Sequence, residues 1–423
     1  MSDMPIAPSS EADSSYLPTP PRERIVVLDI LRGFAIFGIL IVNFEGYGFS
    51  TYYGTDIETQ WPGFGDRLAE KIITLLAIGK FNVLFTFLFG LGFALQMERA
   101  ERQGQSVLSR YTRRLLCLLC IGLFHKFLIW DGDILVTYAV MGFVLLLFRR
   151  AKPRTLLVCA ALFYAVFFAP WEVNEIRAAI SHRPAVAAQH QQEDHTASEE
   201  RHRQEQEAIH IYAHGSFRQI LALRASEALL GYRLGYNSLS HVLSLFLLGM
   251  YVGRKRIFKN LERHRGLFDR MFVWGYGVGF GCGIAMYFIY WPGLPVWVGL
   301  TRPMIFATAK IALAGAYTAT LVKLWSTGRL RLLLDWFASI GKMALSNYIL
   351  QSLVGTLIFY HFGLGLYARI GPLLGLGLSA AIFAGQVWLS KVWLKRAHYG
   401  PLEWVLRSVT YRRRQPVWIS TPI

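Results

Sequence analysis

The sequence predicts an all-α polytopic membrane protein with about ten transmembrane helices, in two groups of five, and with both termini in the cytoplasm. The chain is 54% hydrophobic and only 17% charged, and its apolar residues gather in ten long stretches. Backbone polar groups cannot remain unpaired in lipid, so each stretch must form a helix or a strand of a closed barrel. No stretch alternates apolar and polar residues with a period of two, as barrel strands do, so we expect helices.

The apolar stretches locate these helices. A transmembrane helix needs about 20 apolar residues, or fewer where its neighbours bury it. The first stretch is too long for a signal peptide and has no small-residue cleavage site in the right place, so we expect it to remain as the first helix. In chain order the stretches cover residues 27–45, 74–95, 114–130, 134–148, 155–170, 238–252, 271–290, 303–322, 337–360 and 371–394.

The remaining segments divide the chain into four regions. Residues 1–24 are rich in Pro, Ser and acidic residues, and we expect them to form a disordered cytoplasmic tail. Two membrane halves, 25–171 and 237–414, are separated by an external loop at 172–236. Within that loop, 201–230 has the pattern of an amphipathic helix that can lie on the membrane surface or cap a cavity.

The distribution of Lys and Arg predicts the orientation. Basic residues crowd every second connection, for example 99–114, 149–154 and 254–270, whereas the connections between them hold almost none. The positive-inside rule places the basic connections and both termini in the cytoplasm. A formal charge of +17 also occurs in nucleic-acid-binding proteins. Here the charges cap apolar stretches and do not form one stripe, so nucleic acid is not an expected partner.

Several polar side chains lie inside the predicted spans, where they are costly and commonly face a cavity or each other. Asp29 and Arg32 are one turn apart in the first span and can form a structural ion pair or bind a ligand. Asn43, near the other end of that span, offers two donors and an acceptor. Lys80 lies within the second stretch, just before its Phe-rich part, where it can reach the lipid headgroups or hold an anionic substrate. A polar band in the ninth span suggests a wet cavity and consists of Ser346, Asn347, Tyr348, Gln351 and Ser352.

His125 is the main candidate for chemistry. It lies below the tip of a predicted helical hairpin, and Asp133 opens the next helix, so the two side chains can approach each other. A histidine oriented by a carboxylate can act as a general base at neutral pH, and Asp131 is a second candidate partner. A structural hydrogen bond is the alternative role for His125. No metal site is predicted, and Cys117 and Cys120 lie within a span as small apolar residues.

Five motifs follow one another along the chain: LDILRGFAIFGILIVNF (28–44), GKFNVLFTFLFGLGFALQ (79–96), GLFHKFLIWDGDILVTYAVMG (122–142), GKMALSNYILQS (341–352) and GPLEWVLRSVTY (400–411). Together they span most of residues 25–414 and closely resemble the YeiB-like family of bacterial inner-membrane proteins. The C-terminal half of that family is known only as a domain of unknown function. The resemblance implies a multi-pass protein of the bacterial inner membrane.

That family is in turn similar to the transmembrane acyltransferases, including heparan-alpha-glucosaminide N-acetyltransferase. The similarity implies that an acyl-CoA donor acylates a sugar on the far side of the membrane. Those enzymes carry a reactive histidine in the first external loop, whereas residues 46–70 contain none, so His125 is the candidate in its place. The similarity rests on the first span, where LDxxRG leads to VN at Leu28, Asp29, Arg32, Gly33, Val42 and Asn43.

The leading functional hypothesis is therefore a membrane acyltransferase. An acyl group would pass from a cytoplasmic acyl-CoA to a hydroxyl or amine of an envelope glycan or lipid. His125 would act as the base, Asp133 or Asp131 would orient it, and Asn43 would stabilise the oxyanion. The residues expected to hold the donor or the substrate are Lys80, Arg32, Asp29, Ser346, Asn347, Tyr348 and Gln351.

The alternative hypothesis is a transporter or exporter of a small metabolite or lipid. The same polar groups would then line a path, and no bond would be made. Under either hypothesis the lipid bilayer is a partner and no tightly bound cofactor is expected, with acyl-CoA as the co-substrate of the enzyme. A homodimer is one option for the oligomeric state.

The charge distribution predicts that residues 172–236 are external and that residues 97–112 and 254–268 are cytoplasmic. Two single substitutions in a cysteine-free background, Ser198→Cys and Ser106→Cys, test this with a membrane-impermeant thiol reagent applied to intact cells. We expect labelling at position 198 and none at position 106. Labelling at 106 but not at 198 would reverse the topology.

Overall fold

The computed structural model describes residues 24–49, 57–104, 106–180, 199–200, 202–234, 236–289 and 296–419. Within these ranges the regular structure is helical, with one isolated antiparallel bridge between Ala397 and Trp418. The predicted all-α class is therefore confirmed for the described chain. Residues 1–23 of the predicted tail and 181–198 of the predicted external loop lie outside the described ranges.

The helices follow the apolar pattern of the sequence. In the first half they are α1 Val26–Gly48, α2 Ile57–Gln60, α3 Phe64–Leu76, α4 Lys80–Arg102, α5 Val107–Phe124, α6 Leu135–Leu147 and α7 Pro153–Ile180, with a π-helical turn at His125–Ile129. In the second half they are α9 Phe217–Leu234, α10 Tyr236–Arg254, α11 Arg265–Ile289, α12 Val296–Ser326, α13 Arg331–Lys342, α14 Ala344–Phe359, α15 Pro372–Leu394 and α16 Pro401–Tyr411.

Within the described residues, four helices are long and apolar enough to cross a membrane on their own, and they cover Val26–Gly48, Phe64–Arg102, Thr301–Ser326 and Pro372–Leu394. Three shorter apolar helices cover Pro153–Phe168, Leu239–Arg254 and Ala344–Phe359. All ten predicted stretches overlap helices, but the second is interrupted by a turn at 77–79 between α3 and α4, and the ninth breaks at Met343 between α13 and α14. The count of ten spans and the cytoplasmic termini therefore remain predictions.

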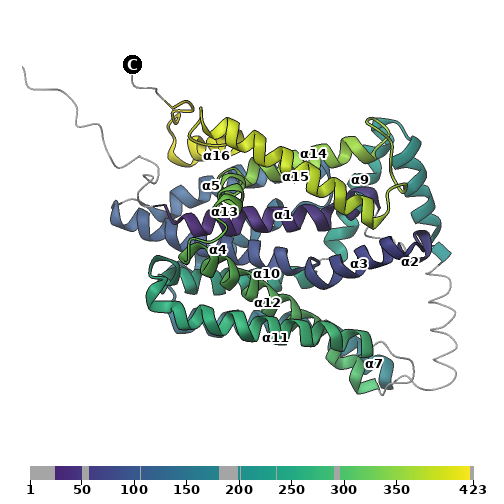
Figure 1. The fold of residues 1–423 in the computed structure, drawn as a ribbon, viewed down its shortest axis with the longest axis horizontal. Coiled ribbons are helices and arrows are strands. Elements are labelled where there is room, and N and C mark those ends of the chain that lie inside the picture. Colours follow the sequence, from purple (N-terminus) through teal and green to yellow (C-terminus); the bar gives the residue numbers. More distant parts are fainter. Residues whose placement is uncertain are drawn as a thin grey trace, which may run out of the picture.

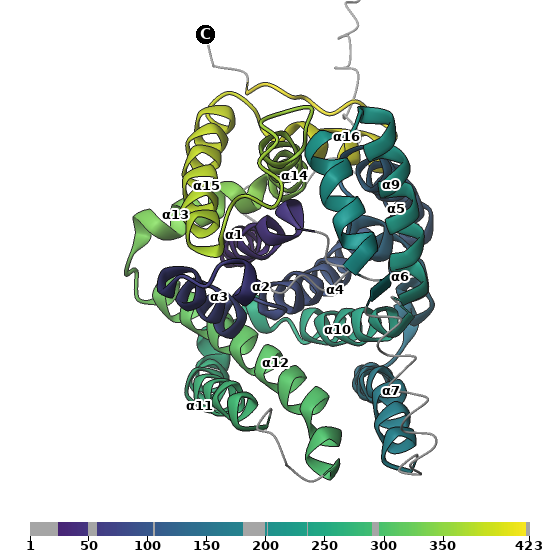
Figure 2. The ribbon, with the colours of Figure 1, turned by 90° about the vertical axis from the view of Figure 1, so that its right-hand side faces the viewer.

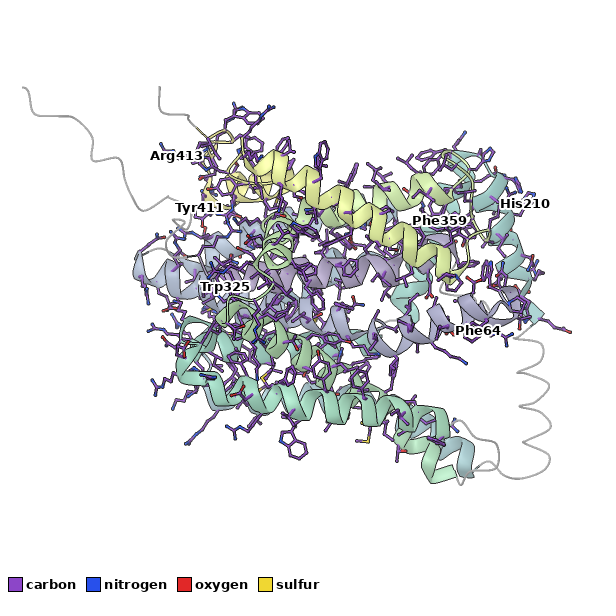
Figure 3. All side chains as sticks on the ribbon, viewed as in Figure 1. Phe64, His210, Trp325, Phe359, Tyr411 and Arg413 are labelled. Atoms are coloured by element: carbon purple, nitrogen blue, oxygen red, sulfur yellow. The ribbon has the colours of Figure 1, made fainter. Side chains whose placement is uncertain are left out.

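The helices form one elongated bundle with two distinct ends (Figure 1). We call the end that carries α16 the basic end and the end that carries α9 the far end. Figure 3 places Tyr411 and Arg413 at the basic end, and Phe64, His210 and Phe359 at the far end. In the view onto the far end, α1 lies near the centre of the bundle (Figure 2). It packs against α4, α12, α13, α14 and α15.

Glycines let several helices touch backbone to backbone. A Cβ added to Gly341 of α13 would lie 1.8 Å from the Asp29 carbonyl oxygen, and one added to Gly249 of α10 would lie 2.1 Å from that of Phe87. Such close contact is a usual basis of helix association in membranes. On α11, a Cβ added to Gly275 would lie 2.8 Å from the Ala312 carbonyl oxygen of α12.

Two helical segments cover the far end of the bundle. The sequence predicts one helix over 201–230, but the chain is helical over 202–214 and again in α9, with a break at Gly215 and Ser216. The break has a local cause, because the Ser216 hydroxyl accepts from the Gln219 N–H, and the Gln219 side chain accepts from the Ser216 N–H at 2.8 Å. This reciprocal pair is a capping box that starts α9.

We predict that Gly249→Val lowers the melting temperature of the detergent-purified protein by several degrees. The valine side chain would collide with the backbone of α4, and overpacking of this kind costs about 1–3 kcal/mol. Gly277→Val is the matched control, because an added Cβ at Gly277 has no atom within 4 Å. Equal melting temperatures for the two variants would contradict the close α4–α10 contact.

Candidate active site

The end of α5 and the start of α6 meet through a buried hydrogen bond. The Nδ1 atom of His125 lies 2.8 Å from Oδ1 of Asp133, and both side chains are fully buried. The other carboxylate oxygen of Asp133 accepts from the Val136 N–H at 2.7 Å, which satisfies a free donor in the first turn of α6. The predicted approach of His125 and Asp133 is thus confirmed.

This geometry selects the tautomer of His125. A carboxylate accepts only from a protonated ring nitrogen, so neutral His125 carries its proton on Nδ1 and its lone pair on Nε2. Nε2 is buried and has no hydrogen-bond partner among the described residues. A buried acceptor without a partner is costly, so Nε2 is well suited to take a proton from a bound substrate.

Aromatic and hydroxyl groups surround the histidine ring. Its centroid lies 5.1 Å from that of Tyr348 and 6.5 Å from that of Trp130. Tyr47 packs on Trp130, and its hydroxyl lies 3.0 Å from that of Ser352. Asn43 joins this group as a hydrogen-bond partner of Tyr47. The structure therefore links Asn43 to the surroundings of His125 through Tyr47.

Asp131 has a different neighbourhood, at the covered tip of the hairpin. Its charge lies within electrostatic range of Tyr212 and Tyr360, and it is 7% exposed. Above the tip, the fully buried Arg224 of α9 donates to the Leu128 carbonyl oxygen at 3.0 Å and stands over the Tyr360 ring. The α9 segment thus closes the far side of the hairpin.

A cavity of about 480 Å³ opens at the basic end of the bundle. Its inner wall is largely apolar and aromatic and includes Phe85, Phe89, Leu135, Tyr138 and Tyr348. His125 does not line this cavity, so Tyr348 separates the cavity from the histidine ring. The mouth is strongly basic, with nine cationic side chains (Arg24, Arg32, Arg99, Arg102, Arg110, Arg114, Lys259, Lys342 and Arg407) and three carboxylates (Asp29, Glu98 and Glu403).

The three carboxylates already have protein partners. Asp29 pairs with Arg24 and with Arg32, the latter at 2.9 Å. Glu98 pairs with Arg102, Arg256 and Lys259. Glu403 accepts from the Leu345 and Ser346 N–H groups, and from the Ser346 hydroxyl at 2.6 Å. None of these carboxylates is left to neutralise the remaining arginines.

Three arginines of the mouth pair with no carboxylate in the described part of the chain, namely Arg110, Arg114 and Arg407. Arg110 and Arg407 lie over the rings of Tyr411 and Tyr399. Arg114 Nε is buried and has no hydrogen-bond partner among the described residues. Burial lowers the pKa of Arg407, and the charges of Arg24 and Arg114 act in the same direction. The mouth of the cavity is therefore suited to a multiply charged anion.

Glu403 was not among the candidates from the sequence, although it organises the polar band of α14. Its carboxylate, from α16, caps the first turn of α14 and engages Ser346. Burial raises the pKa of Glu403, and the hydrogen bonds from Ser346 partly offset the rise. Glu403 belongs to the motif GPLEWVLRSVTY, which the sequence analysis had noted. The motif did not indicate that Ser346, 57 residues earlier in the chain, is the partner of Glu403.

Two other members of the band face α15. The amide of Asn347 donates to the Ser390 hydroxyl at 3.0 Å, and that of Gln351 donates to the Gln386 side chain at 2.9 Å. These bonds join α14 to α15 and give both residues a structural role. Of the predicted binding residues, the cavity wall contains Asp29, Arg32 and Tyr348.

Lys80 lies apart from the cavity. Its ammonium donates to the Thr74 carbonyl oxygen at 2.7 Å and lies 5.9 Å from the centre of the Phe306 ring. It is absent from the cavity wall, where Arg32 is the one basic group that the sequence analysis had selected. Arg110 and Arg114 lie in a basic connection that the sequence analysis used only to predict the topology.

Comparison with known proteins agrees with the motifs. The family described as "Protein of unknown function (DUF418)" matches residues 252–413. The chain is 36% identical over 426 residues to the uncharacterized protein YxaH of Bacillus subtilis (strain 168), covering 97% of this chain and 100% of that protein. It is 27% identical to an uncharacterized 39.9 kDa protein in the amylase 3′ region of Bacillus acidopullulyticus, covering 94% and 97% of the two chains.

The chain is also 27% identical to the uncharacterized protein YeiB of Escherichia coli (strain K12), over 94% of this chain and 99% of that protein. No solved structure matches. The relatives cover nearly the whole chain, both the half with the His125–Asp133 pair and the half with the DUF418 match. The protein therefore belongs to the family of YeiB-like, DUF418-containing membrane proteins.

Proposed function

We propose that this protein is a membrane acyltransferase that moves an acyl group from an acyl-CoA to a hydroxyl or amine of an envelope glycan or lipid. The observation that carries the proposal is the buried His125, which bonds Asp133 through Nδ1 and leaves Nε2 without a partner. A general base needs this arrangement, since one nitrogen is held and the other is free to take a proton. Acyl transfer needs such a base, because the acceptor loses a proton as it attacks the thioester.

The cavity at the basic end supports an anionic donor. Coenzyme A carries several phosphate charges, and Arg110, Arg114 and Arg407 offer guanidinium groups that lack a carboxylate partner in the described chain. Guanidinium groups bind phosphate through two parallel hydrogen bonds. The less polar part of the donor would extend along Phe85 and Phe89 toward Tyr348, which stands between the cavity and His125.

The proposed reaction conserves atoms and charge. The acceptor passes its proton to Nε2 of His125 while its oxygen or nitrogen attacks the thioester carbonyl carbon. Asp133 stabilises the imidazolium that forms, and the Tyr348 hydroxyl or the Asn43 amide donates to the oxyanion. The carbon–sulfur bond then breaks, and the leaving thiolate takes the proton back from Nε2. The products are the acylated acceptor and free coenzyme A.

The two substrates would arrive from opposite sides. With the basic end in the cytoplasm, as the positive-inside rule predicts, acyl-CoA enters the cavity from the cytoplasm. The acceptor approaches from the far end, where Asn43, Tyr47 and Ser352 provide polar groups close to the hairpin tip. The inner membrane is the location that this proposal requires.

We predict that His125→Gln lowers the rate of acyl transfer by about 10²–10⁴-fold, the usual cost of losing a general base. Glutamine keeps the hydrogen-bonding ability of the side chain but cannot take the proton, so donor binding should change little. Asp133→Asn should lower the rate less, because it leaves the base in place and disturbs its orientation. The measurement is thiol release from acyl-CoA by purified protein supplied with membrane glycan and lipid acceptors.

His361→Gln is the matched control for that experiment, because His361 is exposed at the far end and does not contact the His125–Asp133 pair. Its rate should equal that of the wild type. Full activity of His125→Gln would refute the assigned base. Solute flux in vesicles without any thioester cleavage would instead favour the transporter.

We predict that Arg114→Gln raises the KM for acyl-CoA by about tenfold, the effect expected for one lost charge-assisted contact to phosphate. The kcat should change much less, since the arginine lies at the mouth and not at the reacting atoms. Arg113→Gln is the matched control, because the adjacent Arg113 is not part of the cavity wall and donates to the Thr410 carbonyl oxygen at 3.0 Å. Equal KM values for the two variants would exclude Arg114 from donor binding.

A further inference from the structure

Helix α9, which lies at the far end of the bundle (Figure 1), carries a buried cation, Arg224. Its side chain is fully buried, and its Nη1 atom donates to the Leu128 carbonyl oxygen at 3.0 Å. Leu128 belongs to the π-helical turn His125–Ile129, so the guanidinium group lies against the turn that carries the candidate base. An arginine side chain stays charged at any physiological pH. The acyl transfer proposed above leaves this charge without a role.

The guanidinium group of Arg224 has one free edge. Its Nε and Nη2 atoms are buried and have no hydrogen-bond partner among the described residues. These two nitrogens lie side by side on one edge of the planar group, and this edge can bind a carboxylate or a phosphate through two parallel hydrogen bonds. A buried charged donor without a partner destabilises the folded state more than a neutral one does. The free edge is therefore suited to an oxyanion.

The acidic side chains nearby do not occupy this edge. Glu227 lies one turn further along α9, but its carboxylate accepts from the Tyr212 hydroxyl at 2.5 Å. No carboxylate of the described chain forms an ion pair with Arg224. The charges of Glu227 and Asp131 nevertheless act on the Tyr360 side chain together with that of Arg224. They would repel a ligand with several negative charges, so the site favours an anion with one charge.

Aromatic rings cover the guanidinium group, and one of them reaches the surface. The buried Tyr360 ring has its centroid 4.7 Å from the guanidinium carbon of Arg224. The centroid of the Phe362 ring lies 5.9 Å from that carbon, and Phe362 is 40% exposed. Phe217, at the start of α9, packs on Phe362 and is also exposed. Rotation of the Phe362 side chain would therefore connect Arg224 with the surface of the far end.

We propose that Arg224 binds a singly charged oxyanion of the acyl acceptor, either the carboxylate of an acidic sugar or a phosphodiester. The inference rests on the proposed acyl transfer and narrows its acceptor to an anionic envelope compound. The free edge holds the oxyanion by two hydrogen bonds. The contact to Leu128 keeps the bound acceptor near the turn that carries His125. Arg224 thus selects and positions the acceptor and takes no part in making or breaking bonds.

The test measures binding through the melting temperature of the full-length protein in a neutral detergent, without acyl-CoA. Methyl glucuronide, glycerophosphoglycerol, the neutral methyl glucoside and sodium chloride of matched ionic strength are added in separate arms. A ligand that binds the folded state raises the melting temperature as its occupancy grows. We expect a rise of several degrees with at least one of the two anionic probes, and none with methyl glucoside or sodium chloride. The anionic probe that gives the larger rise identifies the group.

Four variants locate the site. Arg224→Gln should lose the rise, and Arg224→Lys should lose most of it, because an ammonium group lacks the edge with two donors. Arg218→Gln is the matched control and should keep the rise, because Arg218 is an exposed arginine of the same helix. His125→Gln should also keep it, since the base does not hold the anion. Failure of the acyl transfer can therefore be told apart from failure of this site.

The other outcomes overturn the proposal. A rise that persists in Arg224→Gln, or an equal rise with methyl glucoside or sodium chloride, would exclude Arg224 as the anion site. No rise with either anionic probe would exclude it as well. If Arg224→Gln does not fold, Arg224→Lys decides, because an undiminished rise in that variant would rule out the two-donor edge. A rise in a protein that transfers no acyl group would overturn the acceptor role and leave an anion site.

Discussion

The hydrogen bond between His125 and Asp133 fixes the part of the bundle on which the candidate site depends. It closes the α5–α6 hairpin in a fully buried position, where an uncompensated carboxylate would be strongly destabilising. Both carboxylate oxygens of Asp133 are hydrogen-bonded. One accepts from the ring of His125, and the other accepts from the Val136 N–H in the first turn of α6. The π-helical turn adds to this closure, since the Trp130 N–H reaches back five residues to the His125 carbonyl oxygen. Wide turns of this kind are frequent at functional sites.

The basic end shows a second constraint, which is electrostatic. Like charges near one another destabilise the folded state unless other charges or a ligand balance them. Asp29 and Glu98 neutralise part of the positive charge at the mouth of the cavity. The carboxylate of Glu403 instead accepts hydrogen bonds from N–H groups of α14. The surplus of positive charge therefore faces the cavity. Under the proposed function the same arginines would have two roles, because the positive-inside rule and phosphate binding both call for arginine at the same end of the helices.

Apolar patterning predicted most of the long helices, since lipid and the bundle core both demand apolar residues, but α2, most of α3 and α16 lie outside the predicted stretches. It did not predict the break at Met343, because that residue lies inside an apolar run that contains no proline. The His125–Asp133 contact was predictable because a short hairpin brings its two arms together. The partners of Lys80, Ser346 and Glu403 were not, because they depend on how distant helices pack. Gln351 and Asn347 were expected at a wet site, but the structure uses them to join α14 to α15.

The side chains that cover His125 on two sides restrict the access of water to its ring, and this limits the reactions that the site can support. On one side Tyr348 separates the ring from the cavity, and on the other Trp130 and the α9 segment cover the hairpin, with Arg224 bonded to the Leu128 carbonyl oxygen. A hydrolase would gain from water at this nitrogen, whereas a transferase loses acyl groups to it. In the proposed reaction, exclusion of water would also strengthen the interaction between the imidazolium and Asp133 as the proton is taken up. The unpartnered Nε2, costly in the resting protein, is thus consistent with a base that is uncovered only when both substrates displace the side chains around it.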